Sequence, residues 1–411
     1  MTDKSILREL AKETAEIAAL PIQEEKRVLW RKLNGLNPQR PMVMIDQVCW
    51  NEMNYDGLLT LRCENPELRV YEEFLRRQLF KWKHFPADMV VEPYIKVNRK
   101  INNTGYGIKV QDETLATDPL NDVMSHSYKD ILQTEEDIEK ITVPDISHDS
   151  ADTSRRLEEA RNIFGGILDV YPVSGEELFL CIWDFISQIK GVENALYAII
   201  DEPEFMHRVA AKLTRSFSGM LDQLEEQGLL PDARLQTTIH CTGAYADELP
   251  APGYNLEKPR CKDLWIAGMA QMFSTVSGAM HEEFELSYAK PIYERFGLVY
   301  YGCCEPLDRK LDIVTKIPNL RKVSMSPWTD AERGAEGLGN SFVFSSKPNP
   351  SFLAFDSFDE EPIINELKKI KAACARNGSP LEFILKDIST VKSQPQRLSH
   401  WAETAMEIAM S

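Results

Sequence analysis

Two consecutive cysteines, Cys303 and Cys304, carry the clearest chemical signal in the sequence. The uncharged run 298–301 predicts a buried strand, and Gly302 ends it, so both thiols and Glu305 are expected where that strand enters a loop. Thiolates accompanied by a histidine or a carboxylate are ligands that zinc selects. Free cysteine is also among the most buried residue types. The doublet therefore predicts either a metal site or two small core residues.

Side chains able to do chemistry also follow the ends of other apolar runs. These residues are Asp46, Trp50, Glu52, Glu92, His240, Trp328, Lys347 and Asp387. Each is weak evidence alone, because a charged residue at a strand end is just as often a solvated one. Enzymes built on parallel barrels distribute their sites over many strand ends in this way. We expect His240 and the cysteine doublet to face one cavity at that rim.

Apolar, strand-like runs alternate with helical segments along the chain. The runs are 42–45, 89–91, 178–182, 235–239, 264–266, 299–301, 322–325, 341–344 and 383–385. Good helical segments are 204–227 and 362–377, each followed by a glycine. The alternation predicts an α/β fold, and the lack of a low-complexity linker favours a single (β/α)8 TIM barrel, residues 39–411, after an N-terminal helical extension, residues 1–38. The acidic stretch 112–154 is expected to be an excursion with much loop.

Charge and composition narrow the classes of function. The net charge of -17 without a basic stripe argues against nucleic acid and against anionic membrane surfaces as partners. No apolar run reaches the length of a membrane span, and the first 20 residues do not form a signal peptide. Eight cysteines without a framework spacing suggest reduced thiols. A cytoplasmic protein is expected, and the sequence shows no motif for nucleotide binding or serine hydrolysis.

Several segments match a known family in order and spacing. A G-x-E segment at 191–196 leads into a P-E helix start at 201–205, and a turn at 347–350 and a helix entry at 395–398 follow at fitting distances. In these features the chain, from about residue 40 to residue 408, resembles the uroporphyrinogen decarboxylase superfamily. The resemblance implies the (β/α)8 barrel that the alternation already predicts.

The branch of that superfamily is indicated by two strand ends. True uroporphyrinogen decarboxylases carry an arginine-rich loop after the first strand, whereas residues 44–50 hold no arginine and add Asp46. The cobamide-dependent methyltransferases hold zinc with a His-x-Cys after one strand and a cysteine after the last. Cys303 matches the thiol of the first position, but the histidine and the last cysteine are missing, and Asp387 stands near the latter. The resemblance is therefore closest in kind to the methyltransferases.

That branch implies methyl transfer between a small substrate and a corrinoid carried by a partner protein. Zinc would lower the pKa of the substrate's thiol or oxygen. The implied metal ligands are His240, Cys303 and Cys304, with a carboxylate such as Glu305 or Asp387. The implied catalytic residues are Glu92, His240, Glu305 and Asp387. The implied substrate-binding residues are Asp46, Trp50, Glu52, Tyr300, Tyr301, Trp328 and Lys347.

The aromatic members of this set suit a methoxylated aromatic, and a methylated amine or thiol is the other expected substrate class. Two further hypotheses stay open. One is a decarboxylase acting on a different substrate, and the other is a non-catalytic barrel that binds a tetrapyrrole or corrinoid. A homodimer is also an open expectation.

The two thiols are not expected to be equivalent. Consecutive residues leaving a strand point to opposite sides, so Cys303 should face the interior and Cys304 the surroundings. A bend at Gly302 would instead turn both thiols inward.

Overall fold

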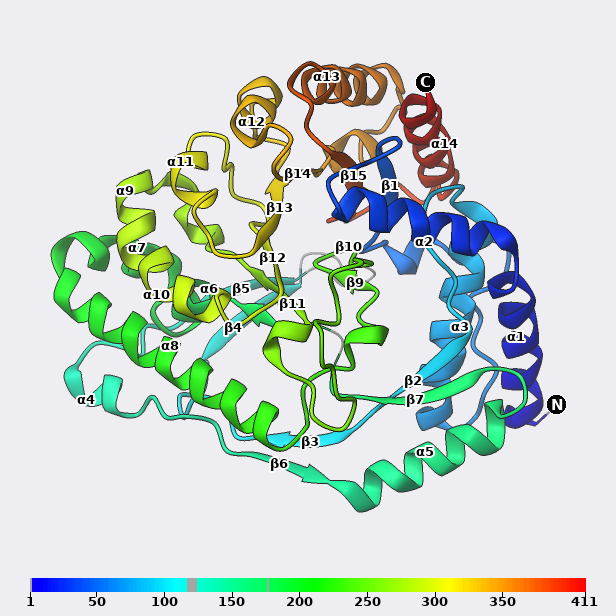
Figure 1. Ribbon diagram of the computed structural model, residues 1–411, viewed down its shortest axis with the longest axis horizontal. Helices are drawn as coiled ribbons and strands as arrows, with labels where there is room; N and C mark the ends of the chain where they lie inside the picture. The colour runs from blue at the N-terminus through cyan, green and yellow to red at the C-terminus, as the bar shows by residue number, and fades with distance from the viewer. Residues whose placement is uncertain (1, 117–123, 176) are drawn as a thin grey trace.

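The computed structural model describes residues 2–116, 124–175 and 177–411. Its centre is a seven-stranded sheet in the order β1-β15-β14-β13-β12-β11-β8, with every neighbouring pair parallel (Figure 1). The strands are β1 (Met42–Ile45), β8 (Phe179–Leu180), β11 (Trp265–Gly268), β12 (Leu298–Tyr301), β13 (Leu320–Met325), β14 (Val343–Ser346) and β15 (Leu381–Leu385). The order follows the chain from β8 to β15 and returns to β1. All carboxyl ends therefore lie at the same edge.

Helices follow or separate most of these strands. They are α1 (Asp3–Ala18), α2 (Pro21–Asn34), α3 (Pro66–His84), α4 (Glu135–Glu139), α5 (Ser150–Phe164), α6 (Ile182–Lys190), α7 (Val192–Asp201), α8 (Pro203–Glu226), α9 (Gly278–His281), α10 (Ser287–Tyr293), α11 (Leu311–Val314), α12 (Ala331–Leu338), α13 (Glu361–Asn377) and α14 (Gln396–Met410). The predicted long helices correspond to α8 and α13. The latter ends at Gly378, whose φ of 70° is a left-handed conformation that glycine adopts without steric cost.

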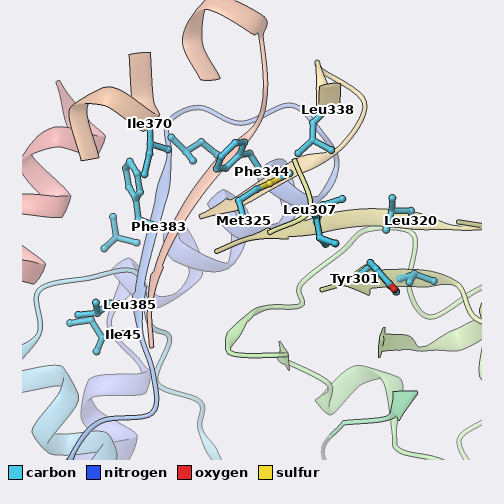
Figure 2. Packing of buried hydrophobic residues seen from close by; sticks show 14 of the residues in the cluster. Ile45, Tyr301, Leu307, Leu320, Met325, Leu338, Phe344, Ile370, Phe383 and Leu385 are labelled. Carbon is cyan, nitrogen blue, oxygen red and sulfur yellow. The ribbon is translucent and has the colours of Figure 1, made fainter. Parts of the chain in front are cut away.

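The two faces of the sheet have different neighbours, because alternate residues of a strand point to opposite sides. Ile45, Phe383 and Leu385 pack with Phe344 and Met325 in the core under the helices (Figure 2). The residues between them face the interior of the curved sheet. There Lys322 of β13 and Glu382 of β15 form a fully buried ion pair with a 2.7 Å contact. Interior and helix-facing residues thus form two separate layers.

The predicted α/β architecture with parallel strands is confirmed, but no closed barrel is detected within the described residues. The run 89–91 forms no strand. The backbone N–H of Asp88 still donates to the Val43 carbonyl of β1, but the backbone groups that follow bond to side chains of α2. Lys26 donates to the Met89 carbonyl at 3.1 Å, and Gln23 accepts the Val91 N–H at 3.0 Å. These bonds replace those of a neighbouring strand.

The predicted run 235–239 also departs from the sheet. It yields only β9 (Thr238–Ile239), which turns back and pairs antiparallel with β10 (Thr242–Gly243). The segment lines the interior beside β11 instead of extending the parallel sheet. The seven parallel strands therefore form an arc whose ends, β8 and β1, are not paired with each other.

The described part of the polar stretch 112–154 lies outside the parallel sheet, as expected, but it contains more regular structure than expected. Its strands are β4 (Asp112–Ala116), β5 (Met124–Tyr128) and β6 (Ile146–Asp149). The strands β2 (Tyr94–Asn98), β3 (Lys100–Asn103) and β7 (Asp169–Val173) flank it, and the pairs are β2-β7, β3-β6 and β4-β5. The N-terminal segment is helical, and Trp30 of α2 reaches the interior, where its indole N–H donates to the Asp88 carbonyl at 2.9 Å.

Breaking the interior ion pair is expected to destabilise the fold strongly. In Glu382→Gln the Lys322 ammonium stays buried without its carboxylate, so the free energy of unfolding should fall by about 3–5 kcal/mol. Denaturant unfolding followed by circular dichroism measures this change. The control is Glu73→Gln, which removes an exposed ion pair with Arg77 and should cost about 0–1 kcal/mol. Equal losses in both variants would contradict the prediction.

Candidate active site

A cavity of about 610 Å³ opens between α2, α3, β1 and the chain that follows Asp88. Three predicted site residues, Asp46, Trp50 and Glu92, are part of its wall. The rest of the wall holds aromatic and charged side chains in equal number. Six are aromatic and six are charged: Trp30, Phe74, Trp82, Phe85, Tyr94 and Tyr245, and Lys26, Glu73, Arg77, Lys81, Lys96 and Glu177. Most ligand pockets combine apolar and aromatic side chains with polar groups, so this cavity is the natural place for a small substrate.

The cavity reaches the interior of the sheet at the β9-β10 turn. His240 and Cys241 occupy this two-residue turn with φ angles of 42° and 69°, a left-handed pair that non-glycine residues rarely adopt. The His240 N–H donates to the Glu177 carboxylate at 2.8 Å. Cys241 and Glu177 line the cavity, and burial raises the pKa of each. The turn therefore places His240 next to a lining residue. His240, Cys303 and Cys304 do not line this cavity themselves, so it is not the shared cavity that the sequence predicts for the three.

Cys303 lies in the interior and Cys304 at the surface, which is the division that strand alternation predicts. Cys303 is 5% exposed, whereas Cys304 is an exposed residue. Gly302 nevertheless bends the chain, with a φ of 96°, and the two sulfurs are only 3.5 Å apart. A Cβ at this glycine would meet Leu307 at 2.5 Å, so the bend depends on the missing side chain. Both thiols thus belong to one site.

Positive charge converges on the Cys303 sulfur. Lys386, the first residue after β15, places its Nζ 3.2 Å from Cys303 Sγ. The hydrogen bond with Cys304, then His240 and Lys386, hold the pKa of Cys303 far below its usual value, against the opposing effect of burial. Burial by itself lowers the pKa of Lys386, but the negative charges of Cys303 and Asp387 outweigh this effect and raise that pKa above its usual value. The ammonium at 3.2 Å and the lowered pKa both favour a thiolate at Cys303.

Glu305 anchors the loop that carries the doublet. Its carboxylate accepts the N–H of Cys303 at 2.9 Å and that of Ala270 at 3.2 Å, and it is fully buried. Burial raises its pKa to about 7. Ser324 of β13 adds a hydrogen bond to the Cys303 carbonyl at 2.8 Å. Because Glu305 contacts backbone amides, its place is that of a positioning residue.

His240 packs against Tyr300, the interior residue of β12. Their ring centroids are 5.1 Å apart, and the Nε2 atom of His240 is buried without a hydrogen-bond partner among the described residues. Lys347 lies over the Tyr300 ring at 5.3 Å and donates to the Ser345 hydroxyl at 2.6 Å. Burial lowers the pKa of Lys347 to about 8. The His240 imidazole lies close enough to Cys303 to lower the pKa of that thiol.

Other predicted residues lie elsewhere. Tyr301 points to the helix side, because it is the neighbour of Tyr300 on the same strand, and it donates to Glu285 at 2.9 Å. Trp328 is 73% exposed in the turn after β13. The Glu52 carboxylate accepts the N–H groups of Val391 and Ser393 at 3.0 and 2.6 Å and so fixes a loop.

Glu92 and Asp387 have different partners. Glu92 is bound by Arg27 at 2.9 Å and by the Tyr245 hydroxyl at 2.6 Å, in the cavity wall near α2. Asp387 approaches the exposed Cys304 at 3.7 Å and Lys386 at 3.1 Å. Glu92 is thus separated from the cysteines, while Asp387 lies on their outer side.

The predicted zinc ligands meet but do not form a metal site as they stand. In the described ranges, no group of three or more His, Cys, Asp or Glu side chains is placed to hold a metal ion. The Lys386 ammonium already neutralises the Cys303 thiolate, and a cation bound there would be repelled by it. The donor set in this arrangement therefore does not fit zinc.

Comparisons with known proteins bear on the overall fold of the chain. No family model matches the chain, and no curated protein sequence matches it. Among solved structures, a methyltransferase from Methanosarcina mazei is similar to 93% of this chain over 97% of its own length, with a TM-score of 0.51 and 12% sequence identity. In the part of the chain that the structure describes, no helix is both long and apolar enough for a membrane span. At this identity the likeness shows that the two chains share an overall fold.

Proposed function

We propose that this chain is a methyltransferase that moves a methyl group between a small substrate and a corrinoid carried by a partner protein. The observation that carries the proposal is the 3.2 Å contact between Cys303 Sγ and Lys386 Nζ, although these two residues do not themselves line the cavity. The fold likeness to a methyltransferase over nearly the whole of both chains supports it. The proposal includes membership of the uroporphyrinogen decarboxylase superfamily and a complete eight-stranded barrel, with residues 88–91 beside β1 as the irregular strand.

The cavity supplies the place for the substrate. The aromatic residues of its wall suit a flat ring, so a methoxylated aromatic is the preferred substrate class, ahead of a methylated amine or thiol. Trp50 carries two cations over its ring, Arg77 at 4.9 Å and Lys81 at 5.9 Å. Asp46 and Cys241 mark the inner end of this cavity, next to His240.

The role proposed for each side chain follows from the charges that form during methyl transfer. In a methyl transfer the moving carbon carries partial positive charge in the transition state, and a fixed thiolate nearby stabilises that charge. The Nε2 atom of His240 is placed to hold the proton that the leaving oxygen or nitrogen needs. Lys386 and Glu305 keep the thiolate ionised and in place. These roles are given to the chain's own residues, and zinc stays a separate prediction.

The test mixes the purified chain with a methoxylated aromatic and free cob(I)alamin, and follows methylcobalamin by its absorption spectrum. Methylcobalamin formation supports the proposal, and zinc analysis of the same protein tests the metal prediction. Carbon dioxide release from carboxylated substrates, without methyl transfer, would favour the decarboxylase hypothesis. That second candidate has its own support in the buried Lys347, whose ammonium donates to the Ser345 hydroxyl and has no carboxylate partner among the described residues. Corrinoid binding without turnover would favour a binding protein.

A further inference from the structure

The cysteine doublet differs from the other six cysteines of the chain. These are Cys49, Cys63, Cys181, Cys241, Cys261 and Cys374, all free, and burial raises the pKa of each. Cys303 instead contacts a lysine ammonium at 3.2 Å and a second sulfur at 3.5 Å. Two sulfurs in contact, one of them exposed and the other beside an ammonium, set this pair apart as the place where an oxidant can join two thiols.

We propose that Cys303 and Cys304 are a reversible oxidation site, at which a peroxide joins the two sulfurs in a disulfide between adjacent residues. The sulfurs need to move only about 1.5 Å closer to reach a bond length of about 2.05 Å. Cys304 is exposed and closes the site from the solvent side, so it can rotate toward Cys303. The bend at Gly302 brings the two side chains together on one side of the chain.

The reaction balances with hydrogen peroxide as the only oxidant. The Cys303 thiolate attacks one peroxide oxygen, the O–O bond breaks, and hydroxide leaves, so that Cys303 becomes a sulfenic acid. The Cys304 sulfur then attacks the Cys303 sulfur, the S–O bond breaks, and the departing hydroxide takes the Cys304 proton to form water. Asp387, 3.7 Å from Cys304 Sγ, can carry that proton in transit. One peroxide thus yields one disulfide, one hydroxide and one water.

The product is expected to be easily reduced. Consecutive Cα atoms are about 3.8 Å apart, which is shorter than the usual span of about 4.4–6.8 Å in disulfides, so the bond is strained. Strained disulfides have more oxidising potentials and return readily to thiols. If the proposed function is correct, oxidation removes the thiolate and stops methyl transfer. That consequence rests on the proposed function, whereas the oxidation itself does not.

One tryptic peptide, residues 296–309, carries both cysteines and makes the test direct. The intact chain is treated with hydrogen peroxide, without methyl donor or corrinoid, and digested for mass spectrometry. We expect this peptide to lose two hydrogens and to regain them with dithiothreitol. In Cys304→Ser the reaction should stop at a Cys303 sulfenic acid that dimedone traps, and in Cys303→Ser the remaining thiol should stay reduced. Cys261→Ser is the matched control and should behave as the wild-type chain.

A second measurement needs no substitution. Phenylarsine oxide bridges neighbouring thiols and should protect the same peptide from alkylation in the folded wild-type chain. Two results would overturn the proposal: a wild-type Cys303 that dimedone traps as fully as in Cys304→Ser, or oxidation of another cysteine before the doublet. Because no methyl transfer is measured, a failed methyltransferase assay leaves this test intact.

Discussion

Replacing Cys303 by serine is expected to lower the rate of methyl transfer by about 10²–10³-fold, the loss typical when a preorganised stabilising group is removed. Serine keeps the size and hydrogen bonding of the side chain, but its hydroxyl is not ionised at neutral pH. The variant therefore loses the negative charge and keeps the loop, which Glu305 and Ser324 hold through backbone atoms. Methylcobalamin formation measures the rate, and thermal unfolding should show an intact fold.

The neighbouring cysteine provides the control. In Cys304→Ser a hydroxyl replaces the thiol whose sulfur lies 3.5 Å from Cys303 Sγ, so a hydrogen-bond donor stays beside Cys303. Cys304 is exposed and its pKa is raised, so this variant should retain most of the activity. Cys261→Ser, in the core, should also retain it. A Cys303→Ser variant as active as the wild-type chain would show that the doublet has no part in the chemistry, and would move the assignment toward the decarboxylase or binding hypotheses.

Much of the fold is predictable because buried parallel strands leave uninterrupted apolar runs between helices. The runs at β1, β11, β12 and β15 are of this kind. The run 89–91 looks the same in sequence, yet its backbone bonds to side chains of α2, which are more than 60 residues away. No local pattern encodes such a partner. The closed barrel was therefore expected, while the structure shows an arc.

The central residues of the site could be predicted from the sequence, whereas some of the residues around them could not. The adjacent thiols and His240 stand out by residue type, and the structure brings them together. Lys386 could have been found by the rule that already selected Asp387, since it is the first residue after the last strand. Cys241 follows His240 directly after the run 235–239 and was open to the same rule. Glu177 gave no signal, because its contact with His240 depends on a turn with two left-handed residues. The assignment of Tyr301 ignored the alternation that places its neighbour Tyr300 inside.

Substitution of Lys386 by methionine is expected to shift the reactivity of Cys303 to higher pH. Cys304 contributes most to the low pKa of Cys303, followed by His240 and Lys386, so losing the ammonium raises that pKa only in part. A group with a lowered pKa is ionised above that pKa and becomes protonated as the pH falls through it. The wild-type thiolate should thus persist through pH 6, and the variant should lose it at a higher pH.

Alkylation of the peptide 296–309 by iodoacetamide measures this shift. In the wild-type chain the rate should hardly change between about pH 6 and pH 8, because only the thiolate reacts. In Lys386→Met the rate should fall about tenfold per pH unit below the new pKa, and methyl transfer should decline over the same range. Lys386→Arg retains a cation and should restore the flat profile. Lys368→Met, on the exposed side of α13, is the control. An unchanged profile in Lys386→Met would mean that the imidazole of His240 and the thiol of Cys304 suffice to ionise Cys303, and Lys386 would then have to be assigned to the substrate instead.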